Sequence, residues 1–442
     1  MKLPVAPTPW VQLLQRHASS LGNILAARLR PEPGGKYEHW DHLRHLSPPA
    51  GLSPEEWWVG IKFARHAIGR ELALHDKAGK PFTMSLPDSM QRRLFLIARD
   101  AAGSIQGLER IEDDPSRERY LIRSLIEEAM TSSQLEGAAT TTQVAKAMLK
   151  TGRQPRDYGE RMIFNNYATM LELKRWLPQP LTPDMVFEMH RMLTQETLAS
   201  DAAGRLRRSD EDIVVEDEAG NVLHVPPAAS ELPRRLQALC DFANSDDPEA
   251  FIHPVIRAIV IHFQIGYDHP FCDGNGRTAR ALFYWSMLRS GFWMTEYLSI
   301  SSILRKAPSK YSRAFLFTES DESDVSYFID HQLDVILSAI ESLHGYLARK
   351  EEERTRVETL LKPGSRLAAR INHRQRAVLL NALRHPDRHY TIEAHRRAHD
   401  VTYQTARTDL RGLVSAGLME QHQQGRAFVF QAAPDLAGRL KH

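Results

Sequence analysis

The chain has 442 residues, a net charge of +2, 42% hydrophobic residues and two cysteines. Its length predicts two or three domains, and its charge balance argues against a general nucleic-acid binder or a membrane-surface protein. No apolar run approaches the ~20 residues of a membrane helix, the N-terminus shows no secretory signal, and two cysteines are too few for a disulfide framework or a zinc site. We therefore expect a cytoplasmic protein without membrane contact.

The first hundred residues are rich in proline and tryptophan and predict a structural N-terminal extension, residues 1–100. A helix is expected from Pro54 to Leu74, and the overlapping stretch 69–86 indicates two short strands that turn at Gly79. Helical periodicity dominates the rest of the chain, so the expected fold is mainly α.

Residues 101–362 predict a helical-bundle domain. Its first strong helix, 117–137, carries a regular apolar stripe and ends at Gly137, which suits a left-handed C-cap. Further helices are expected at 159–176, 183–194, 230–245, 254–266, 276–290 and 324–361. Between them, 204–227 predicts a β-hairpin that turns near Gly220-Asn221 and ends at Pro226-Pro227.

A loop between two of these helices specifies a chemistry. It contains His269-Pro270-Phe271-Cys272-Asp273-Gly274-Asn275-Gly276-Arg277-Thr278-Ala279-Arg280. The layout places a glycine-rich, basic loop at a helix N-terminus, where unpaired N–H groups and the helix dipole favour a phosphate.

The residue types in this loop suit three chemical roles. A neutral His269 can take a proton from a Ser, Thr or Tyr hydroxyl, and the Asp273 carboxylate suits one Mg²⁺ that also borrows ligands from phosphates. Two glycines let backbone amides approach phosphate oxygens, and an amide and two guanidinium groups can bind the same anion. These candidate nucleotide-binding residues are Gly274, Asn275, Gly276, Arg277 and Arg280.

Three other interpretations of the loop fail on spacing. A P-loop needs Lys followed by Ser or Thr after its glycines, and an EF-hand needs more carboxylates and a terminal Glu. Zinc binding by His253, His262 and His269 lacks helical or hairpin ligand spacing. A glycine turn with surface arginines would not explain the whole ordered set.

The loop resembles the signature of the Fic family, His-x-Phe-x-Asp/Glu-Gly-Asn-Gly-Arg-x-x-Arg, and matches it at every specified position. The resemblance implies that His269 is the base and Asp273 the Mg²⁺ ligand. It also implies a cradle at Gly274, Asn275 and Gly276, with Arg277 and Arg280 holding the triphosphate. Asp268, which precedes the histidine, departs from the apolar residue often found there; it would either alter the pKa of the base or face solvent.

A second motif, Ser132-Ser133-Gln134-Leu135-Glu136-Gly137, ends the helix at 117–137. A carboxylate at a helix C-terminus is unfavourable to the helix dipole, so Glu136 needs a cationic partner. The motif is similar to the inhibitory motif of self-inhibited Fic proteins, which implies roles for Ser132 and Glu136. Glu136 would pair with Arg280 and occupy the place of the ATP γ-phosphate.

Pro363-Gly364-Ser365 breaks the chain before a basic segment. From Arg370 to His442 the chain holds 12 Lys/Arg and 6 Asp/Glu. Helices at 374–385, 391–399 and 403–417, followed by a hairpin over 419–431 that turns at Gln424-Gly425, resemble a winged helix-turn-helix over 366–442. Arg407, Arg411 and Arg426 suit phosphate contacts on DNA. Winged helices also serve protein contacts, and we favour homodimerisation or target docking for this segment over DNA binding.

Together these patterns predict a protein adenylyltransferase that moves AMP from ATP to a hydroxyl of a target protein or of itself. The 204–227 hairpin would align the target by strand addition, as the resemblance implies. Three alternatives remain: transfer of UMP, phosphocholine or a γ-phosphate; removal of AMP with help from Glu136; and a winged-helix regulator whose Fic domain senses nucleotide.

Overall fold

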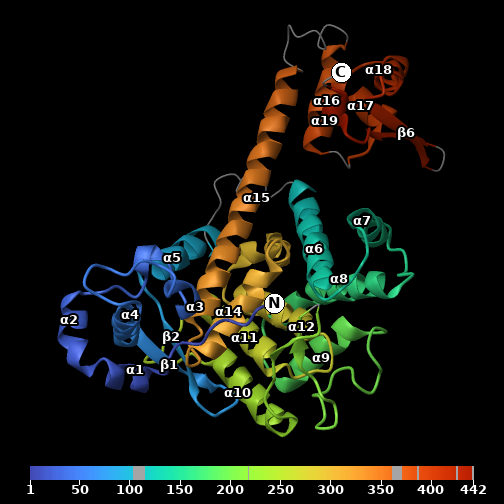
Figure 1. Cartoon of the computed structure of the whole chain (residues 1–442). Coiled ribbons are helices and arrows are strands. Elements are labelled where there is room, and N and C mark those ends of the chain that lie inside the picture. The colour runs from blue at the N-terminus through green and yellow to red at the C-terminus, as the bar shows by residue number, and fades with distance from the viewer. Residues whose placement is uncertain (103–114, 218, 361–370, 386–387, 425–426, 441–442) are drawn as a thin grey trace. The chain divides into compact units, whose positions relative to one another are not determined.

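A computed structural model describes residues 1–102, 115–217, 219–360, 371–385, 388–424 and 427–440. The chain forms two compact units. The first comprises the described residues of 1–103 and 123–340, and the second comprises those of 104–122 and 341–442. The mainly α-helical fold expected from the sequence is confirmed, and the strands form three small sheets (Figure 1).

The N-terminal part of the first unit packs short helices around α4. Its elements are α1 (Trp10–Arg16), α2 (Leu21–Ala26), α3 (Trp40–Leu43), α4 (Pro54–Ile68), β1 (Gly69–His75), β2 (Pro81–Ser85) and α5 (Asp88–Ala102). The prediction that α4 reaches Leu74 is wrong, because the chain turns extended at Gly69 and Leu72 and Leu74 are buried as alternate residues of β1. The strands β1 and β2 form the predicted hairpin, with Gly79 at a φ of 81°.

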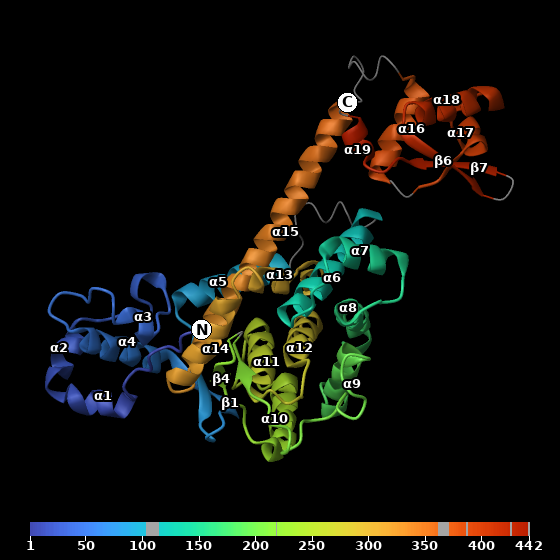
Figure 2. The same cartoon turned by 45° about the vertical axis from the view of Figure 1, so that its right-hand side comes forward.

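The middle of the first unit is a bundle of helices that includes several the sequence did not predict (Figure 2). Its helices are α6 (Pro115–Leu135), α7 (Thr142–Thr151), α8 (Tyr158–Trp176), α9 (Pro183–Thr194), α10 (Leu232–Asn244), α11 (Pro254–Asp268), α12 (Asn275–Arg289), α13 (Ile300–Leu304) and α14 (Pro308–Ser320). Helices α11 and α12 pack against each other and are buried on all sides, as expected for the centre of a bundle. The sequence did not predict α5, α7, α13 or α14.

The predicted hairpin between α9 and α10 is short. β3 (Val215–Glu216) pairs antiparallel with β4 (Val222–His224), and Val215 lies opposite His224. The Asp217 Oδ1 accepts hydrogen bonds from the backbone N–H groups of Ala219 and Asn221, which closes the turn. We call residues 204–227 the flap.

A buried polar network joins α4 to the loop after α14 in the first unit. Lys62 Nζ lies 2.8 Å from Asp321 Oδ1, and both side chains are almost fully buried. The Tyr327 hydroxyl donates to the other oxygen of the Asp321 carboxylate at 2.8 Å and accepts a hydrogen bond of the same length from Arg65. The proline-rich N-terminal residues are therefore an integral part of the first unit.

Besides the end of a long helix, the described residues of the second unit after 370 form four helices and a three-stranded sheet. Helix α15 (Ser326–Leu360) runs into it from the first unit, and its remaining elements are α16 (His373–Arg384), β5 (Tyr390–Thr391), α17 (Ile392–His399), α18 (Tyr403–Ser415), β6 (Met419–Gln424), β7 (Ala427–Ala432) and α19 (Leu436–Arg439). The strands lie in the order β5-β7-β6. Arg426 and the predicted turn at Gly425 lie outside the described residues.

Within this unit Asp409 of α18 is buried. Its carboxylate accepts hydrogen bonds from Asn372 and Arg374 at 2.6 Å, and His395 of α17 lies 3.2 Å away. These contacts fix α18 against α16 and α17. Over the residues that the structure describes, no helix is both long and apolar enough to cross a membrane; the cytoplasmic location stays a prediction.

Candidate active site

The loop 269–274 joins α11 to α12 through two left-handed residues. His269 ends α11 with a φ of 44°, and Gly274 precedes α12 with a φ of 80°. A Cβ on Gly274 would lie 2.8 Å from Thr194 Cγ2, so glycine is required by space as well as by conformation. The backbone thus delivers the free N–H groups of the α12 N-terminus to one place, as an anion site requires.

Asn275 braces this loop from within. Its Oδ1 accepts from Phe271 N at 2.9 Å, and its Nδ2 donates to Phe271 O at 2.8 Å. The side chain is buried and both ends of its amide are engaged. One N–H of the Asn275 amide is thus used within the loop, where the residue shapes the cradle. The donation from its second N–H to a phosphate stays a prediction.

His190 of α9, which was not among the residues predicted from the sequence, packs against the loop. Its ring stacks on Phe271 with centroids 3.8 Å apart and planes inclined by 7°. Its Nε2 lies 2.8 Å from Asp273 O, and its Nδ1 accepts from Gly204 N at 2.9 Å. Burial lowers the pKa of His190 to about 4, so the ring is neutral near pH 7.

Asp273 presents a partly exposed carboxylate. One oxygen accepts from Gly274 N at 2.6 Å, and the other lies 3.1 Å from Arg277 Nη2. Arg277 is fully buried and also donates to Leu193 O at 3.0 Å, so it orients Asp273 and ties the loop to α9. The side chain of Asp273 is 40% exposed, which leaves lone pairs open to solvent.

Arg280 and the end of α6 form the centre of the site. Arg280 is 2% exposed; its Nε donates to Ser132 Oγ at 2.8 Å, and its Nη2 donates to Ser132 O at 3.0 Å and to Glu136 Oε1 at 2.8 Å. Burial opposes the charged form of Arg280 and is the largest single effect, but Glu136, Tyr311 and Glu128 together outweigh it and raise the pKa of Arg280. Ser132 and Glu136 lie 148 and 144 residues before Arg280 in the chain, so the two motifs meet at one guanidinium group.

Glu136 fills the space beside Gly276, at the start of α12. A Cβ added to Gly276 would overlap the Glu136 carboxylate, with Glu136 Cδ at 3.0 Å and Arg280 Nη1 at 3.1 Å. Gly276 lies in α12 with an ordinary helical conformation. The glycine is thus required here by the position of Glu136 and not by its own backbone.

Glu128 lies on α6, about two helical turns before Glu136, and anchors this helix. Its carboxylate accepts from Ser299 Oγ at 2.9 Å and from Ser301 N at 3.1 Å, and it is 1% exposed. Burial raises the pKa of Glu128 although these donors and Arg280 oppose the shift. Only the folded partners, which come from the start of α13, reveal this role.

His269 has the form that a base requires. Its Nδ1 lies 3.3 Å from Gly266 O, and because a carbonyl can only accept, Nδ1 carries the proton and Nε2 keeps its lone pair. Burial lowers the pKa of His269, against the weaker opposing effects of the Gly266 carbonyl and Glu136. A neutral imidazole near pH 7 follows.

The flap is tied to the histidine loop. Arg207 N donates to Pro270 O and Arg207 Nε donates to His269 O, both at 2.9 Å.

Asp268, the residue before His269, is buried and does not face solvent. Its carboxylate accepts hydrogen bonds from Arg235 Nε at 2.7 Å and from Gln264 Nε2 at 2.9 Å. Asp268 therefore fixes the end of α11.

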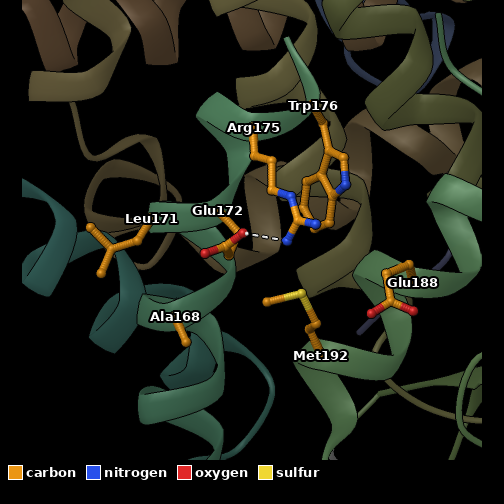
Figure 3. Close-up of a pocket in the computed structure, with 7 residues that line it drawn as sticks. All are labelled: Ala168, Leu171, Glu172, Arg175, Trp176, Glu188 and Met192. Carbon is orange, nitrogen blue, oxygen red and sulfur yellow. Dashed lines mark ion pairs between the residues drawn. The ribbon is translucent and has the colours of Figure 1, made fainter. Parts of the chain in front are cut away.

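A separate groove lies between two helices of the bundle. It has a volume of about 610 Å³ between α8 and α9 (Figure 3), and its lining residues are Ala168, Leu171, Glu172, Arg175, Trp176, Glu188 and Met192. Glu172 and Arg175 form an ion pair of 3.5 Å at its rim. No residue of the two motifs lines this groove, so it carries none of the chemistry described above.

The helical bundle, the anion cradle at the start of α12 and the adjacent base define a class of site that can bind a nucleotide phosphate beside a hydroxyl acceptor. Residues 180–287 match the Fic/DOC family model, and the chain therefore contains a Fic domain.

The chain is also similar to proteins that are named adenylyltransferases. The chain is 31% identical over 169 residues to Protein adenylyltransferase Fic of Nematostella vectensis, which covers 36% of this chain and 37% of that protein. It is 28% identical over 178 residues to Protein adenylyltransferase fic-1 of Caenorhabditis elegans, which covers 40% and 33% respectively. The chain thus spans little more than a third of these relatives. Among solved structures, a Fic family protein from Desulfovibrio desulfuricans aligns with a TM-score of 0.49 and 17% identity, covering 78% of this chain and 95% of that one.

The carboxylate of Asp273 fits a Mg²⁺ ion that is also bound by the phosphates of a substrate. Among the described residues no group of three or more His, Cys, Asp or Glu side chains could hold a metal ion, so an all-protein cage is not offered. A single carboxylate at Asp273 beside an anion cradle matches the preference of Mg²⁺ for one or two carboxylates plus phosphate oxygens and water. Asp273 would hold the ion, which would neutralise charge on the phosphates when bound.

Proposed function

We propose that this chain is a protein adenylyltransferase. It would use Mg²⁺ and ATP and transfer AMP to a Ser, Thr or Tyr hydroxyl of a protein, including its own chain. The observation that carries the proposal is the meeting of a neutral histidine base with a cradle for an anion and a carboxylate for a hard cation. The adenylyltransferase names of the relatives support it for the matched region.

In this reaction His269 Nε2 accepts the proton of the acceptor hydroxyl. The hydroxyl oxygen forms a bond to the α-phosphorus, the bond between that phosphorus and the bridging oxygen breaks, and pyrophosphate leaves. The backbone amide of Gly276 and the Arg280 guanidinium are suited to hold phosphate oxygens as charge develops on them. The Gly274 amide donates to Asp273 in this structure and would have to leave that carboxylate to join them. Arg277 supports the reaction indirectly by holding Asp273.

Glu136 would inhibit the reaction. Its carboxylate occupies a hydrogen-bonding position on Arg280 that a γ-phosphate would need, and like charges exclude each other from the same guanidinium group. Ser132 adds two further bonds to Arg280 and keeps the end of α6 in place. The wild-type chain is therefore expected to be weakly active.

The test compares four proteins with α-labelled ATP and Mg²⁺. They are the wild type, Glu136→Gly, Glu136→Gly with His269→Ala, and the matched surface variant Glu172→Gly. Label should rise in Glu136→Gly, vanish with His269→Ala and stay at the wild-type level in Glu172→Gly. Equal labelling in all four, or none with any nucleotide, would contradict the proposal.

The same assay separates the alternatives. Competition by UTP, a choline nucleotide or γ-labelled ATP identifies a different transferred group. Loss of label from a modified target on adding wild type, but not Glu136→Gly, would assign removal of AMP to Glu136.

For the second unit we propose DNA binding through α18. Tyr403, Gln404, Thr408 and Arg411 are exposed on this helix and Arg407 is half-buried beside them, so one face offers groups that bind base edges and phosphates. The proposed boundaries are 1–100, 101–362 and 366–442, the last as a winged helix.

Fluorescence anisotropy of the full chain with random duplex DNA tests this proposal. The double variant Arg407→Ala with Arg411→Ala should weaken binding and reduce the salt slope by about 2 if each arginine contacts one phosphate. Arg175→Ala serves as the control. Salt-independent or absent binding would favour homodimerisation or target docking by this unit, which sedimentation velocity would show.

A further inference from the structure

His190 has two polar contacts that the proposed reaction does not use. It is fully buried, and it contacts both the loop that presents Asp273 and Gly204, where the flap begins. Gly204 lies 14 residues from His190 along the chain and Asp273 lies 83 residues from it. The imidazole therefore bridges parts of the fold that no continuous element joins.

The hydrogen-bond partners fix the tautomer of the ring. Gly204 N–H is a donor, so Nδ1 must accept; Asp273 O is an acceptor, so Nε2 must carry the proton and donate. Either other form, the Nδ1–H tautomer or the cation, would place a proton against the Gly204 N–H. Both contacts exist together in one neutral form only.

The ring is also held against movement. It stacks on Phe271 with a 3.8 Å centroid separation, and its backbone carbonyl accepts from Thr194 Oγ1 at 2.7 Å. A Cβ on Gly274 would lie 3.4 Å from His190 Nε2, so the loop has little room to shift toward the imidazole. A displacement of the Asp273 backbone must therefore move His190, and through Nδ1 it must disturb Gly204.

We propose that His190 is a positioning residue that couples the cation-binding loop at Asp273 to the flap. The proposal deepens the proposed function, since it assumes that Asp273 holds Mg²⁺ with ATP and that the flap meets the target. Occupation of the cradle by Mg²⁺ and ATP then steadies Asp273, His190 and Gly204 in turn. The flap becomes ordered for its target when nucleotide is bound, and by reciprocity an occupied flap strengthens Mg²⁺-ATP binding.

The variant His190→Phe tests the coupling because it keeps the stacked ring and removes both hydrogen bonds. A matched control is His39→Phe. His39 is also buried, stacks on Phe317 with centroids 4.4 Å apart and planes inclined by 11°, and has a pKa lowered to about 4 by burial. It lies in the N-terminal part of the first unit, away from the cradle. Both variants are made in the Glu136→Gly background of the full chain.

Two readouts are measured. The first is Mn²⁺ binding in the presence of a non-hydrolysable ATP analogue, followed by electron paramagnetic resonance; loss of a partner that orients a metal ligand weakens metal binding by about 10–100-fold. The second is hydrogen exchange of the Gly204 amide and the flap, with and without Mg²⁺ and the same analogue. Nucleotide should slow flap exchange in Glu136→Gly and in the His39→Phe control, but not in His190→Phe.

Weaker Mn²⁺ binding with loss of the nucleotide-dependent flap protection in His190→Phe alone supports the coupling. Equal changes in both variants, or unchanged binding and protection in His190→Phe, overturn it. If His190→Phe does not fold, ¹⁵N spectra of histidine-labelled wild type decide: an Nε2–H ring at pH 7 supports the proposal, and an Nδ1–H or cationic ring overturns it. Binding and exchange do not depend on turnover, so an inactive Glu136→Gly protein would count against the proposed function and not against the coupling.

Discussion

Replacement of Gly276 by alanine should change the stability of this protein in opposite directions depending on Glu136. Gly276 adopts an ordinary helical conformation near the start of α12, so alanine fits the backbone there. In a helix, alanine is favoured over glycine by up to about 1 kcal/mol. In the Glu136→Gly background, Gly276→Ala is therefore expected to stabilise the fold slightly.

In the wild-type background the same methyl group meets Glu136. It would overlap the carboxylate and approach Glu136 Cδ to 3.0 Å, which is too close for the 2.8 Å bond between Glu136 and Arg280 to persist. Arg280 is buried and Glu136 is one-quarter exposed. Separating the pair therefore leaves the Arg280 charge buried without its carboxylate partner, while Glu136 can still reach water. Allowing for that exposure, we expect a loss of about 1–3 kcal/mol.

Chemical denaturation of the wild type, both single variants and the double variant measures this coupling as a double-mutant cycle. The expected interaction energy is about 1–4 kcal/mol, the sum of the loss in the wild type and the gain in the Glu136→Gly background, with a change of sign between the two. The same effect of Gly276→Ala in both backgrounds would refute the proposed geometry.

Buried groups give three further predictions. Because burial lowers the pKa of His269, the acid limb of the rate–pH profile should have its midpoint below the usual 6.5 of histidine, and a midpoint above 6.5 would contradict an unprotonated buried base. Lys62→Met leaves the Asp321 carboxylate buried and should cost about 3–5 kcal/mol in denaturant unfolding, with much of the loss restored by adding Asp321→Leu; additive losses would contradict the pairing. Asn275→Asp removes the donor to Phe271 O and places a carboxyl whose folded pKa burial must raise. A carboxyl whose pKa is raised by folding favours the folded state most at low pH, and this contribution to the free energy of folding is lost as the pH rises through the folded pKa. The stability of this variant should therefore be closer to that of the wild type at pH 5 than at pH 8, and equal deficits at both pH values would contradict the prediction.

The elements that sequence predicted well carry strong local signals. The loop at 269–280 concentrates glycines, a proline and an N-terminal helix start, and α9 begins at Pro183 behind the capping residue Thr182. Helix α5 carries a helical signal in its sequence, since Met90, Leu94, Ile97 and Ala101 recur at helical spacing and are all buried. The end of α4 was harder because helical and alternating patterns overlap at 69–74, and the packing of Leu72 and Leu74 decides between them.

The side-chain roles in the site were less accessible to sequence. Whether an asparagine donates to a phosphate or to its own loop depends on the backbone path between Phe271 and Asn275, which no spacing rule specifies. His190 and Glu128 act through partners far away in the chain and lie on helices where a buried polar residue is usually only a packing feature. For both, the folded contacts supply the only signal.

The site explains why a glycine pattern alone underdetermines function. Gly274 is demanded by its left-handed backbone and by Thr194, whereas Gly276 is demanded by the carboxylate of Glu136. A sequence therefore shows two similar glycines where the molecule has one conformational and one steric requirement. Because the second depends on a residue outside the loop, the cradle and the end of α6 must be altered together. A chain that loses Glu136 loses its reason to keep Gly276 small, except for whatever the phosphate itself requires.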